Sequence, residues 1–434
     1  MAKGAGRCNV VKLYLKNIGK ISEANVEING ITVIGGENNT GKSTIGKSLF
    51  SIFSSFYEIQ QQIRRERLLS IKGALQAFYQ NVYVWMSGEM KDIDEYSADI
   101  LSKAKDYIES PELLKKELDS IMKHELMPSK LFINKMSTEE IVSQIIDILK
   151  IPDEAIFNSV VSKKINAEFN GQVLNIYSET EGIISLIVRQ KELRINISEG
   201  AAIASGFNDS LHTEVIYIDD PFVLDDINFR SFHRKTVYSG HREQLMTKLL
   251  SKGGNESVVN ELVAENKFEK IYKRIVSVCD GNIIVQQNGR LAYRLNNADK
   301  SLSVINLSTG LKTFVILKTL LTNGTIERNG IVILDEPEIH LHPEWQLLFA
   351  ELIVLLNKEF GVSILLNTHS PYFLRAIQVY SAKYEMSDMC KYYLADFNEE
   401  KRVCVTDVTD CVDKIYVKLS QPLQMLEDTR WEDD

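Results

Sequence analysis

The chain has 434 residues, of which 44% are hydrophobic and 25% are charged. These fractions are those of ordinary globular protein, so they exclude collagen-like, low-complexity and wholly disordered chains. The formal net charge of −9 argues against a protein whose entire surface grips nucleic acid, although local basic patches are compatible with it. Because no apolar run is long enough to span a bilayer and the first residues lack a secretion signal, we expect a cytoplasmic protein without a membrane segment.

The five cysteines are scattered along the chain and include no Cys-x-x-Cys pair. An odd, dispersed set is typical of reduced thiols and not of disulfides or structural zinc. We therefore interpret all five as packing residues: Cys8, Cys279, Cys390, Cys404 and Cys411.

Residues 1–54 show strand patterns followed by a helix pattern. Val10–Leu15 and Ala24–Ile28 alternate apolar and polar residues, as half-buried strands do. Ile31–Ile34 is a short, apolar, β-branched run, which indicates a buried strand entering a glycine turn. Apolar residues then recur at helical spacing from Ser43 to Ile52.

Residues 55–165 predict a helical insertion of domain size. Aliphatic residues recur there at helical spacing among charged ones, and prolines at 111, 128 and 152 divide the stretch into separate helices. No heptad pattern is sustained, so a long coiled-coil arm is not expected. Residues 166–225 are interpreted as a β lobe, with strands at Ala167–Tyr177, Gly182–Arg189, Leu193–Ile197 and Val215–Ile218.

Residues 226–278 have mainly helical character, and residues 279–434 alternate helices with strands. A hairpin is predicted over 282–295, with its turn at Asn288-Gly289. Two predicted helices then each precede an apolar strand: Gly310–Thr322 before Ile331–Leu334, and Trp345–Lys358 before Val362–Asn367. This order is typical of a parallel sheet, so we expect an α/β fold.

The segment from Gly36 to Ser43 matches the phosphate-loop pattern G-x-x-x-x-G-K-[ST] between a predicted strand and a predicted helix. Glycines let backbone N–H groups wrap phosphates at the positive end of a helix. Lys42 would reach the β- and γ-phosphates, and the Ser43 hydroxyl would bind Mg²⁺. The alternative is a plain glycine turn. The predicted phosphate-binding residues are Gly36, Asn38, Asn39, Thr40, Gly41, Lys42, Ser43 and Thr44.

Asp335 and Glu336 follow a predicted buried strand, at the carboxyl end where open α/β sheets bind ligands. Asp335 would hold the Mg²⁺ ion, and Glu336 would polarise the attacking water as a general base. The alternative is that the pair caps the next helix. Coupled with a phosphate loop, the pair indicates nucleotide hydrolysis.

Two further motifs lie beside predicted elements of the same sheet. Ser308, Thr309 and Gly310 open a helix, where hydroxyl and N–H groups can bind an anion, although an ordinary N-cap serine is the alternative. His369 follows the next strand and is either structural or catalytic.

These four motifs, in this order, resemble the ABC-type ATPase heads of SMC, RecF and OLD-family proteins over residues 1–54 and about 270–420. Ser308-Thr309-Gly310 resembles the ABC signature, and His369 the switch histidine that senses the γ-phosphate. The run Leu334–Gln346 and the segment Thr368–Pro371 are similar to the OLD-like branch. The resemblance implies a P-loop NTPase fold with a mixed sheet, an antiparallel N-terminal β lobe, and ATP and Mg²⁺ as ligands.

The resemblance also implies how such a head works. Two heads sandwich ATP, so we expect a homodimer or a higher oligomer. OLD nucleases carry a Toprim domain after the ATPase, but only about sixty residues follow His369 here. We therefore expect a separately encoded effector, a nuclease or toxin, as in bacterial anti-phage defence. The glutamine that contacts the metal in many relatives has no clear match here, and the two candidates for its place are Gln190 and Asp219.

Several readings stay open. One open question is whether His340 and His342 bind a metal ion or contact the partner head. Another is whether two basic stretches bind nucleic acid or form a solvated surface: Arg64–Arg67, and His233–Lys235 with Arg242. A DNA-repair or chromosome-maintenance ATPase that binds DNA directly is the rival function, and a scaffold with almost no turnover is a third.

Overall fold

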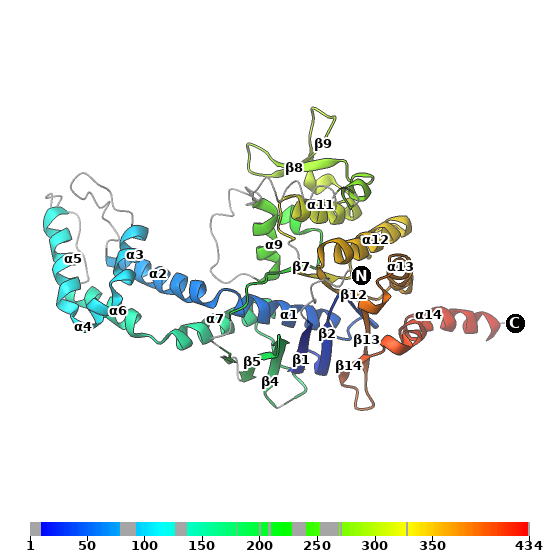
Figure 1. Cartoon of the computed structure of the whole chain (residues 1–434), viewed down its shortest axis with the longest axis horizontal. Coiled ribbons are helices and arrows are strands. Elements are labelled where there is room, and N and C mark those ends of the chain that lie inside the picture. Colours follow the sequence, from blue (N-terminus) through cyan, green and yellow to red (C-terminus); the bar gives the residue numbers. More distant parts are fainter. Residues whose placement is uncertain are drawn as a thin grey trace, which may run out of the picture. The chain divides into compact units, whose positions relative to one another are not determined.

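The computed structural model describes residues 10–78, 93–125, 137–178, 180–198, 201–206, 210–227, 240–251, 269, 271–326 and 329–432. The chain divides into two compact units, Met1–Tyr57 with Val161–Asp434, and Glu58–Val160 (Figure 1). We call the first the head and the second the helical unit. Among the described residues, no helix is both long and apolar enough to cross a membrane.

The head is built on a mixed sheet of eleven described strands, ordered β6-β5-β4-β1-β2-β14-β13-β3-β12-β11-β7. Its parallel part comprises β13 (Cys390–Phe397), β3 (Ile31–Gly35), β12 (Ser363–Thr368), β11 (Ile331–Asp335) and β7 (Val215–Ile218). The short β3 is buried at all five positions, as expected for a parallel strand covered on both faces.

An antiparallel lobe adjoins this parallel part. It consists of β1 (Val11–Ile18), β2 (Ile21–Ile28), β4 (Gly182–Val188), β5 (Lys191–Ser198) and β6 (Ala201–Ser205). β14 (Val403–Asp407) joins the two parts, antiparallel to β13 and parallel to β2. The predicted α/β fold, with a mixed sheet and an antiparallel N-terminal lobe, is confirmed.

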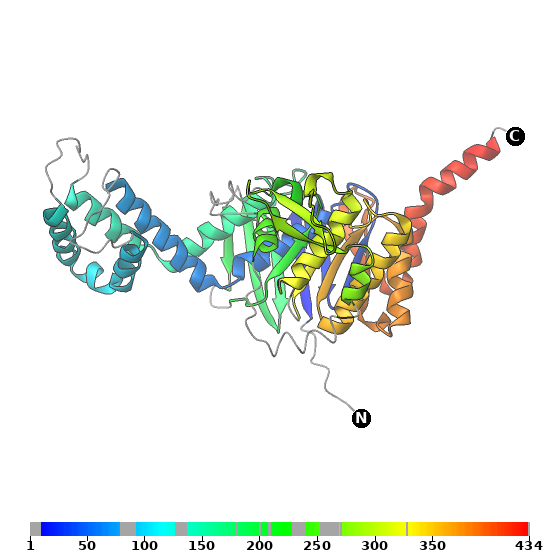
Figure 2. The same ribbon diagram turned by 90° about the horizontal axis from the view of Figure 1, so that it is seen from above.

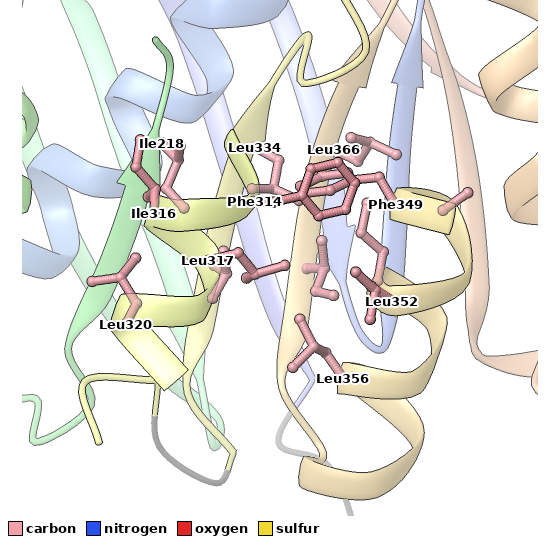
Figure 3. Close-up of a cluster of buried hydrophobic side chains, with 14 of the residues drawn as sticks. Ile218, Phe314, Ile316, Leu317, Leu320, Leu334, Phe349, Leu352, Leu356 and Leu366 are labelled. Carbon is pink, nitrogen blue, oxygen red and sulfur yellow. The ribbon is translucent and has the colours of Figure 1, made fainter. Parts of the chain in front are cut away.

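Helices α11 (Thr309–Thr322) and α12 (Pro343–Phe360) pack over the sheet (Figure 3). The Phe314 and Phe349 rings meet edge to face, with centroids 5.5 Å apart, above Leu334 and Leu366 of the central strands. Burying a side chain of this size contributes about 1.5–3 kcal/mol. These contacts fix the distances between the strand ends, which carry the sequence motifs.

The remaining elements of the head are helices and a small second sheet. The helices are α1 (Lys42–Phe56), α8 (Val223–Asp226), α9 (His241–Leu250), α13 (Pro371–Lys383) and α14 (Asp413–Glu432), with short 3-10 turns at Val304–Asn306, Ser387–Met389 and Thr409–Cys411. The predicted hairpin is present as β8 (Gly281–Val285) and β9 (Leu291–Leu295), extended by β10 (Leu302–Ser303). The last turns of α14 extend away from the sheet (Figure 2).

The helical unit has a core of its own. Its described helices are α2 (Ile59–Phe78), α3 (Ile93–Ser102), α4 (Ala104–Glu109), α5 (Pro111–Glu125), α6 (Thr138–Lys150) and the first half of α7 (Asp153–Glu168). Leu75, Ile100, Leu114 and Ile145 are fully buried in one cluster. Pro111 is the first residue of α5. Proline has no backbone N–H, and at this position the missing N–H would have had no acceptor within the helix.

Two predictions are wrong. Ala167–Tyr177 is not a strand, because α7 runs to Glu168 and the left-handed residues Asn170 and Gly171 then turn the chain. Only an isolated bridge from Leu174 to Ile18 remains there. Cys411 is exposed and therefore is not a packing residue, unlike the buried Cys279 and Cys390; Cys404 is half-buried, and Cys8 lies outside the described residues.

Candidate functional site

The loop between β3 and α1 has a backbone that requires glycine at two positions. A Cβ atom at Gly36 would lie 2.4 Å from the carbonyl oxygen of Ala395, and Gly41 has a left-handed φ of 75°. Asn39 is also left-handed, with a φ of 69°, and its side chain accepts a hydrogen bond from Lys20. The loop is thus closely fitted to its neighbours, as a cradle for phosphate must be.

Lys42 points back into this loop. Its side chain is 4% exposed, and its Nζ donates to the carbonyl oxygens of Gly36 at 3.0 Å and Glu37 at 2.8 Å. Thr40 also donates to the carbonyl of Glu37, at 2.8 Å. A buried ammonium group that is hydrogen-bonded to neutral carbonyl oxygens can replace these bonds with stronger, charge-assisted hydrogen bonds to phosphate oxygens.

Asp335 ends β11 with both carboxylate oxygens engaged by neighbouring strands. Its Oδ1 accepts a hydrogen bond from Asn367 Nδ2 at 2.9 Å, and its Oδ2 accepts one from Tyr217 Oη at 3.0 Å. Asn367 lies on β12 and Tyr217 on β7, the two strands that flank β11. The orientation of the carboxylate is therefore fixed from both sides.

Glu336 lies between two basic side chains. Its Oε1 is 3.4 Å from Lys42 Nζ and 3.3 Å from His369 Nδ1. The contact with His369 is the main cause that lowers the pKa of Glu336, and the same contact raises the pKa of His369. The structure thus brings together Lys42, Glu336 and His369 from three separate motifs.

The backbone of Glu336 is strained in a way that serves this arrangement. Its φ is 47°, a left-handed value that costs about 1–2 kcal/mol in a non-glycine residue. The conformation is held by its N–H group, which donates to the carbonyl oxygen of Asn367 at 2.9 Å. Strain of this kind is typical of functional sites.

Glu338 is a residue of this site that the sequence did not single out. It is 2% exposed, and its Oε1 accepts hydrogen bonds from the Thr368 hydroxyl and from the His369 N–H group, the latter at 3.3 Å. Burial raises its pKa. Its position in the run Leu334–Gln346 was the available signal. Glu338 ties the loop that carries His369 to the end of β11.

The signature-like residues form a second feature. Ser308 caps α11, its Oγ accepting from the N–H of Leu311 at 3.4 Å, and a Cβ at Gly310 would lie 2.8 Å from the carbonyl of His340. An open hollow of about 440 Å³ is lined by Ser308, Thr309, Gly310, His340, His342 and Trp345. The lining of this hollow includes neither Lys42 nor Glu336, and His340 is the residue that it shares with the pocket at Asp335 and Glu336.

The structure distinguishes the two candidates for the further metal contact. Ile218 of β7 pairs with Leu334 of β11, so Asp219 lies next to Asp335, whereas Gln190 lies in the β4–β5 turn. Asp219 and Asp335 line one small pocket with Glu336. The Oδ1 of Asp219 is buried without a hydrogen-bond partner among the described residues.

His241 holds the other oxygen of Asp219. Its Nε2 is 2.9 Å from Asp219 Oδ2, and its Nδ1 is 2.6 Å from Glu168 Oε1. Burial by itself would lower the pKa of His241, but the bonds to the two carboxylates outweigh it and raise the pKa to about 9. The imidazole is therefore protonated at neutral pH.

Among the basic candidates, Arg67 and Arg242 have structural partners, whereas Arg64 and Arg65 are exposed. Arg67 donates to the carbonyls of Ile148 and Leu149 at the end of α6, and Arg242 pairs with Asp220 and Asp226. The stretch 233–235 lies outside the described residues. Within the part of the chain that the structure describes, no group of three or more His, Cys, Asp or Glu residues is arranged to hold a metal, His340 and His342 included.

The AAA ATPase domain family matches residues 9–374, a span that contains the phosphate loop, Asp335, Glu336 and His369. The chain belongs to this family. The motifs of this AAA-family protein, in their chain order, resemble those of ABC-type ATPase heads.

Curated relatives of this AAA-family protein match shorter regions. The "Retron Vc95 probable ATPase" of Vibrio cholerae is 27% identical over 194 residues, covering 40% of this chain and 37% of the relative. The "Retron Ec83 probable ATPase" of Escherichia coli is 38% identical over 96 residues, covering 20% and 17%. The chain thus spans less than two fifths of the length of either relative.

Among solved structures, the SMC head domain from Thermotoga maritima aligns with 92% of this AAA-family protein and 98% of that chain, at 11% identity and a TM-score of 0.37. An SMC head with an extended coiled coil, bound to the C-terminal domain of ScpA derived from Pyrococcus furiosus, aligns with 97% and 99%, at 11% identity and a TM-score of 0.39. At these scores the likeness carries no functional argument.

Proposed function

We propose that this protein binds and hydrolyses ATP at a site completed by a second copy of the chain, and so acts as a nucleotide-dependent dimeric switch. The observation that carries the proposal is the meeting of Lys42, Glu336 and His369, with Glu336 within 3.4 Å of both cations. A cation for phosphate, a carboxylate base and a phosphate-sensing histidine are the parts that ATP hydrolysis needs.

The residues at the site fit Mg²⁺ as well as nucleotide. The Ser43 hydroxyl at the start of α1, the Asp335 carboxylate and the unpartnered Oδ1 of Asp219 are hard oxygen donors of the kind that Mg²⁺ prefers. When bound, Mg²⁺ would neutralise charge on the β- and γ-phosphates. Gly36, Asn38, Asn39, Thr40, Gly41 and Thr44 would surround those phosphates.

Glu336 is restrained by the two side chains that contact it. An oxygen that is paired with Lys42 and His369 is ionised but is a weak proton acceptor, because both cations stabilise its charge. Phosphate oxygens would attract both cations away from Glu336. Glu336 would then be free to accept a proton from the attacking water, so binding and activation are coupled through one carboxylate.

The second copy would supply the signature residues. Ser308, Thr309 and Gly310 lie at the positive N-terminus of α11 and border an open hollow. A γ-phosphate held by the partner's loop suits this position, because helix N-termini bind anions. Ser308 and Gly310 of one copy would thereby cap the nucleotide of the other, in a homodimer or in a higher oligomer of dimers.

The biological role that we propose is bacterial anti-phage defence, beside a separately encoded nuclease or toxin. Two curated relatives named as retron probable ATPases support this assignment. Direct DNA binding is the rival function. The internal pairing of Arg67 and Arg242 and the net charge of −9 favour defence over that rival. Steady-state ATPase rates with and without duplex DNA separate the two.

Two variants test the composite site by light scattering with and without ATP. Glu336→Gln keeps the phosphate ligands but removes the base, so it should bind ATP and accumulate as a dimer. Ser308→Arg places a bulky side chain where the partner's γ-phosphate must approach, so it should bind ATP and stay monomeric.

The control is Lys42→Ala, which should lose binding of a fluorescent ATP analogue, because Lys42 is the cation that the phosphate-loop motif places at the β- and γ-phosphates. Equal dimerisation of the Glu336→Gln and Ser308→Arg variants in ATP would contradict the composite site. Retained nucleotide affinity in Lys42→Ala would contradict the phosphate loop.

A further inference from the structure

A chain of buried polar side chains leads from Asp335 to the end of α7. Tyr217 is 1% exposed, donates from Oη to Asp335 Oδ2 at 3.0 Å, and stacks on the His241 ring with centroids 4.2 Å apart. His241 in turn contacts Glu168, the last residue of α7. We call Glu168, His241 and Tyr217 the buried relay.

The His241 ring is fixed in position at three points. Its Nδ1 lies 2.6 Å from Glu168 Oε1, its Nε2 lies 2.9 Å from Asp219 Oδ2, and its backbone N–H donates to Glu168 Oε2 at 3.0 Å. A ring that is hydrogen-bonded to Glu168 at Nδ1 and through its backbone, and ion-paired with Asp219 at Nε2, cannot rotate without losing these contacts. The plane against which Tyr217 stacks is therefore set by Glu168 and Asp219.

Helix α1 is shaped to admit the Tyr217 hydroxyl. A Cβ atom at Gly46 would lie 3.1 Å from Tyr217 Oη and 3.0 Å from Ile333 Cγ2. Glycine inside a helix costs about 1 kcal/mol relative to alanine, so its presence here is explained by the close approach of the tyrosine. The same helix begins with Lys42 and Ser43, which places the hydroxyl beneath the phosphate-binding helix.

The relay limits how Asp335 can meet a metal ion. Asn367 occupies one acceptor position on Oδ1, and Tyr217 occupies one on Oδ2. A carboxylate has about four such positions, so one remains on each oxygen, in a fixed direction. Without the tyrosine hydroxyl the carboxylate would be free to rotate about its bond to the chain.

We propose that Tyr217, held by His241 and Glu168, is a positioning residue that orients Asp335 for Mg²⁺. The inference rests on the proposed function, in which Asp335 is a metal ligand. Hydrogen-bond partners of metal ligands change metal affinity or activity by about 10–100-fold when they are removed. The relay contacts no substrate atom and acts through Asp335.

Tyr217→Phe tests the relay, because it removes only the hydroxyl. Binding of a fluorescent ATP analogue is measured in EDTA and across a Mg²⁺ titration. We expect unchanged binding in EDTA and an increase of about tenfold in the Mg²⁺ concentration at half-saturation. Tyr293→Phe is the matched control, since Tyr293 is also buried but its hydroxyl contacts Cys279, and it should leave both measurements unchanged.

Two more variants distinguish an error in the proposed metal site from an error in the positioning role of Tyr217. Asp335→Asn should shift the Mg²⁺ dependence strongly; if it does not, the proposed metal site is wrong. If Asp335→Asn shifts it and folded Tyr217→Phe does not, only the positioning role is overturned. Should Tyr217→Phe not fold, Glu168→Gln decides: a smaller shift in the same direction supports the relay, and wild-type Mg²⁺ dependence overturns it.

Discussion

At the scale of single residues, the site combines strain with buried charge. Glu336 adopts a left-handed backbone, and Glu338 is a nearly inaccessible carboxyl group with one unpartnered oxygen. Such features are destabilising and persist only where their surroundings fix them. Here Asn367 fixes the first and Thr368 the second. The same strand, β12, therefore holds both glutamates in place.

Glu338 offers a sharp prediction at this scale. Glu338→Ala leaves the Thr368 hydroxyl and the His369 N–H group without their acceptor. The loss of these hydrogen bonds destabilises the ordered conformation of the loop that carries His369 by about 1–3 kcal/mol. We expect the ATPase rate to fall about 5- to 100-fold while binding of an ATP analogue is retained. Glu338→Gln keeps the acceptor oxygen and should stay near the wild-type rate. Equal rates in both variants would contradict the positioning of His369 by Glu338.

At the scale of elements, α12 and α13 are joined by a charged contact. Glu351 of α12 is 3% exposed and accepts hydrogen bonds from Tyr384 Oη at 2.5 Å and Lys383 Nζ at 3.1 Å, with Arg274 Nε 3.4 Å away. Burial acts to raise the pKa of Glu351, but the hydrogen bonds and the two cations outweigh it, and the pKa is lowered.

This contact makes the stability of the head depend on pH. Because the folded-state pKa of Glu351 lies below its unfolded value, its contribution is full above the unfolded value and is lost as pH falls through the folded one. Glu351→Gln should reduce the free energy of unfolding by about 1–3 kcal/mol at pH 7 and by much less at pH 3. Urea unfolding at both pH values measures this. Glu399→Gln, at an exposed position, is the control and should change little at either pH.

At the scale of the whole molecule, the helical unit has its own core, whereas the residues proposed for catalysis lie in the head. The chain leaves the head at Tyr57 and returns at Val161. Within the head these ends are close, since Lys164 Nζ donates to the carbonyl oxygen of Ser54 at 2.5 Å. A short linker can therefore replace residues 58–160.

We expect that deletion to leave the binding of an ATP analogue within about threefold of wild type, because the residues around Lys42 are untouched. If the helical unit is the partner-facing module, co-purification with the co-expressed product of the neighbouring gene should be lost. Circular dichroism checks that the head is folded. A folded head that no longer binds nucleotide would show that the helical unit is part of the site and would contradict its role as a docking module.

The sequence by itself determined the features that are local in the chain. The phosphate loop, the pair Asp335-Glu336 and the position of His369 after a strand are readable because each motif is a few residues next to an apolar run. The α/β class and most strands are readable for the same reason. Ala167–Tyr177 was misread because alternating residues also occur in an irregular segment, and the Asn170-Gly171 turn decides the outcome.

Only the tertiary structure decided which of these residues meet. The order β3-β12-β11-β7 places Lys42, His369, Glu336 and Asp219 at one edge, although they are far apart in sequence. It also places Asp219, and not Gln190, beside Asp335, and joins Tyr217 to Asp335. Sequence patterns report whether a residue is buried, but the partner of a buried polar group depends on strand order and register. Those are set by long-range packing, so the buried relay could be found only in the folded molecule.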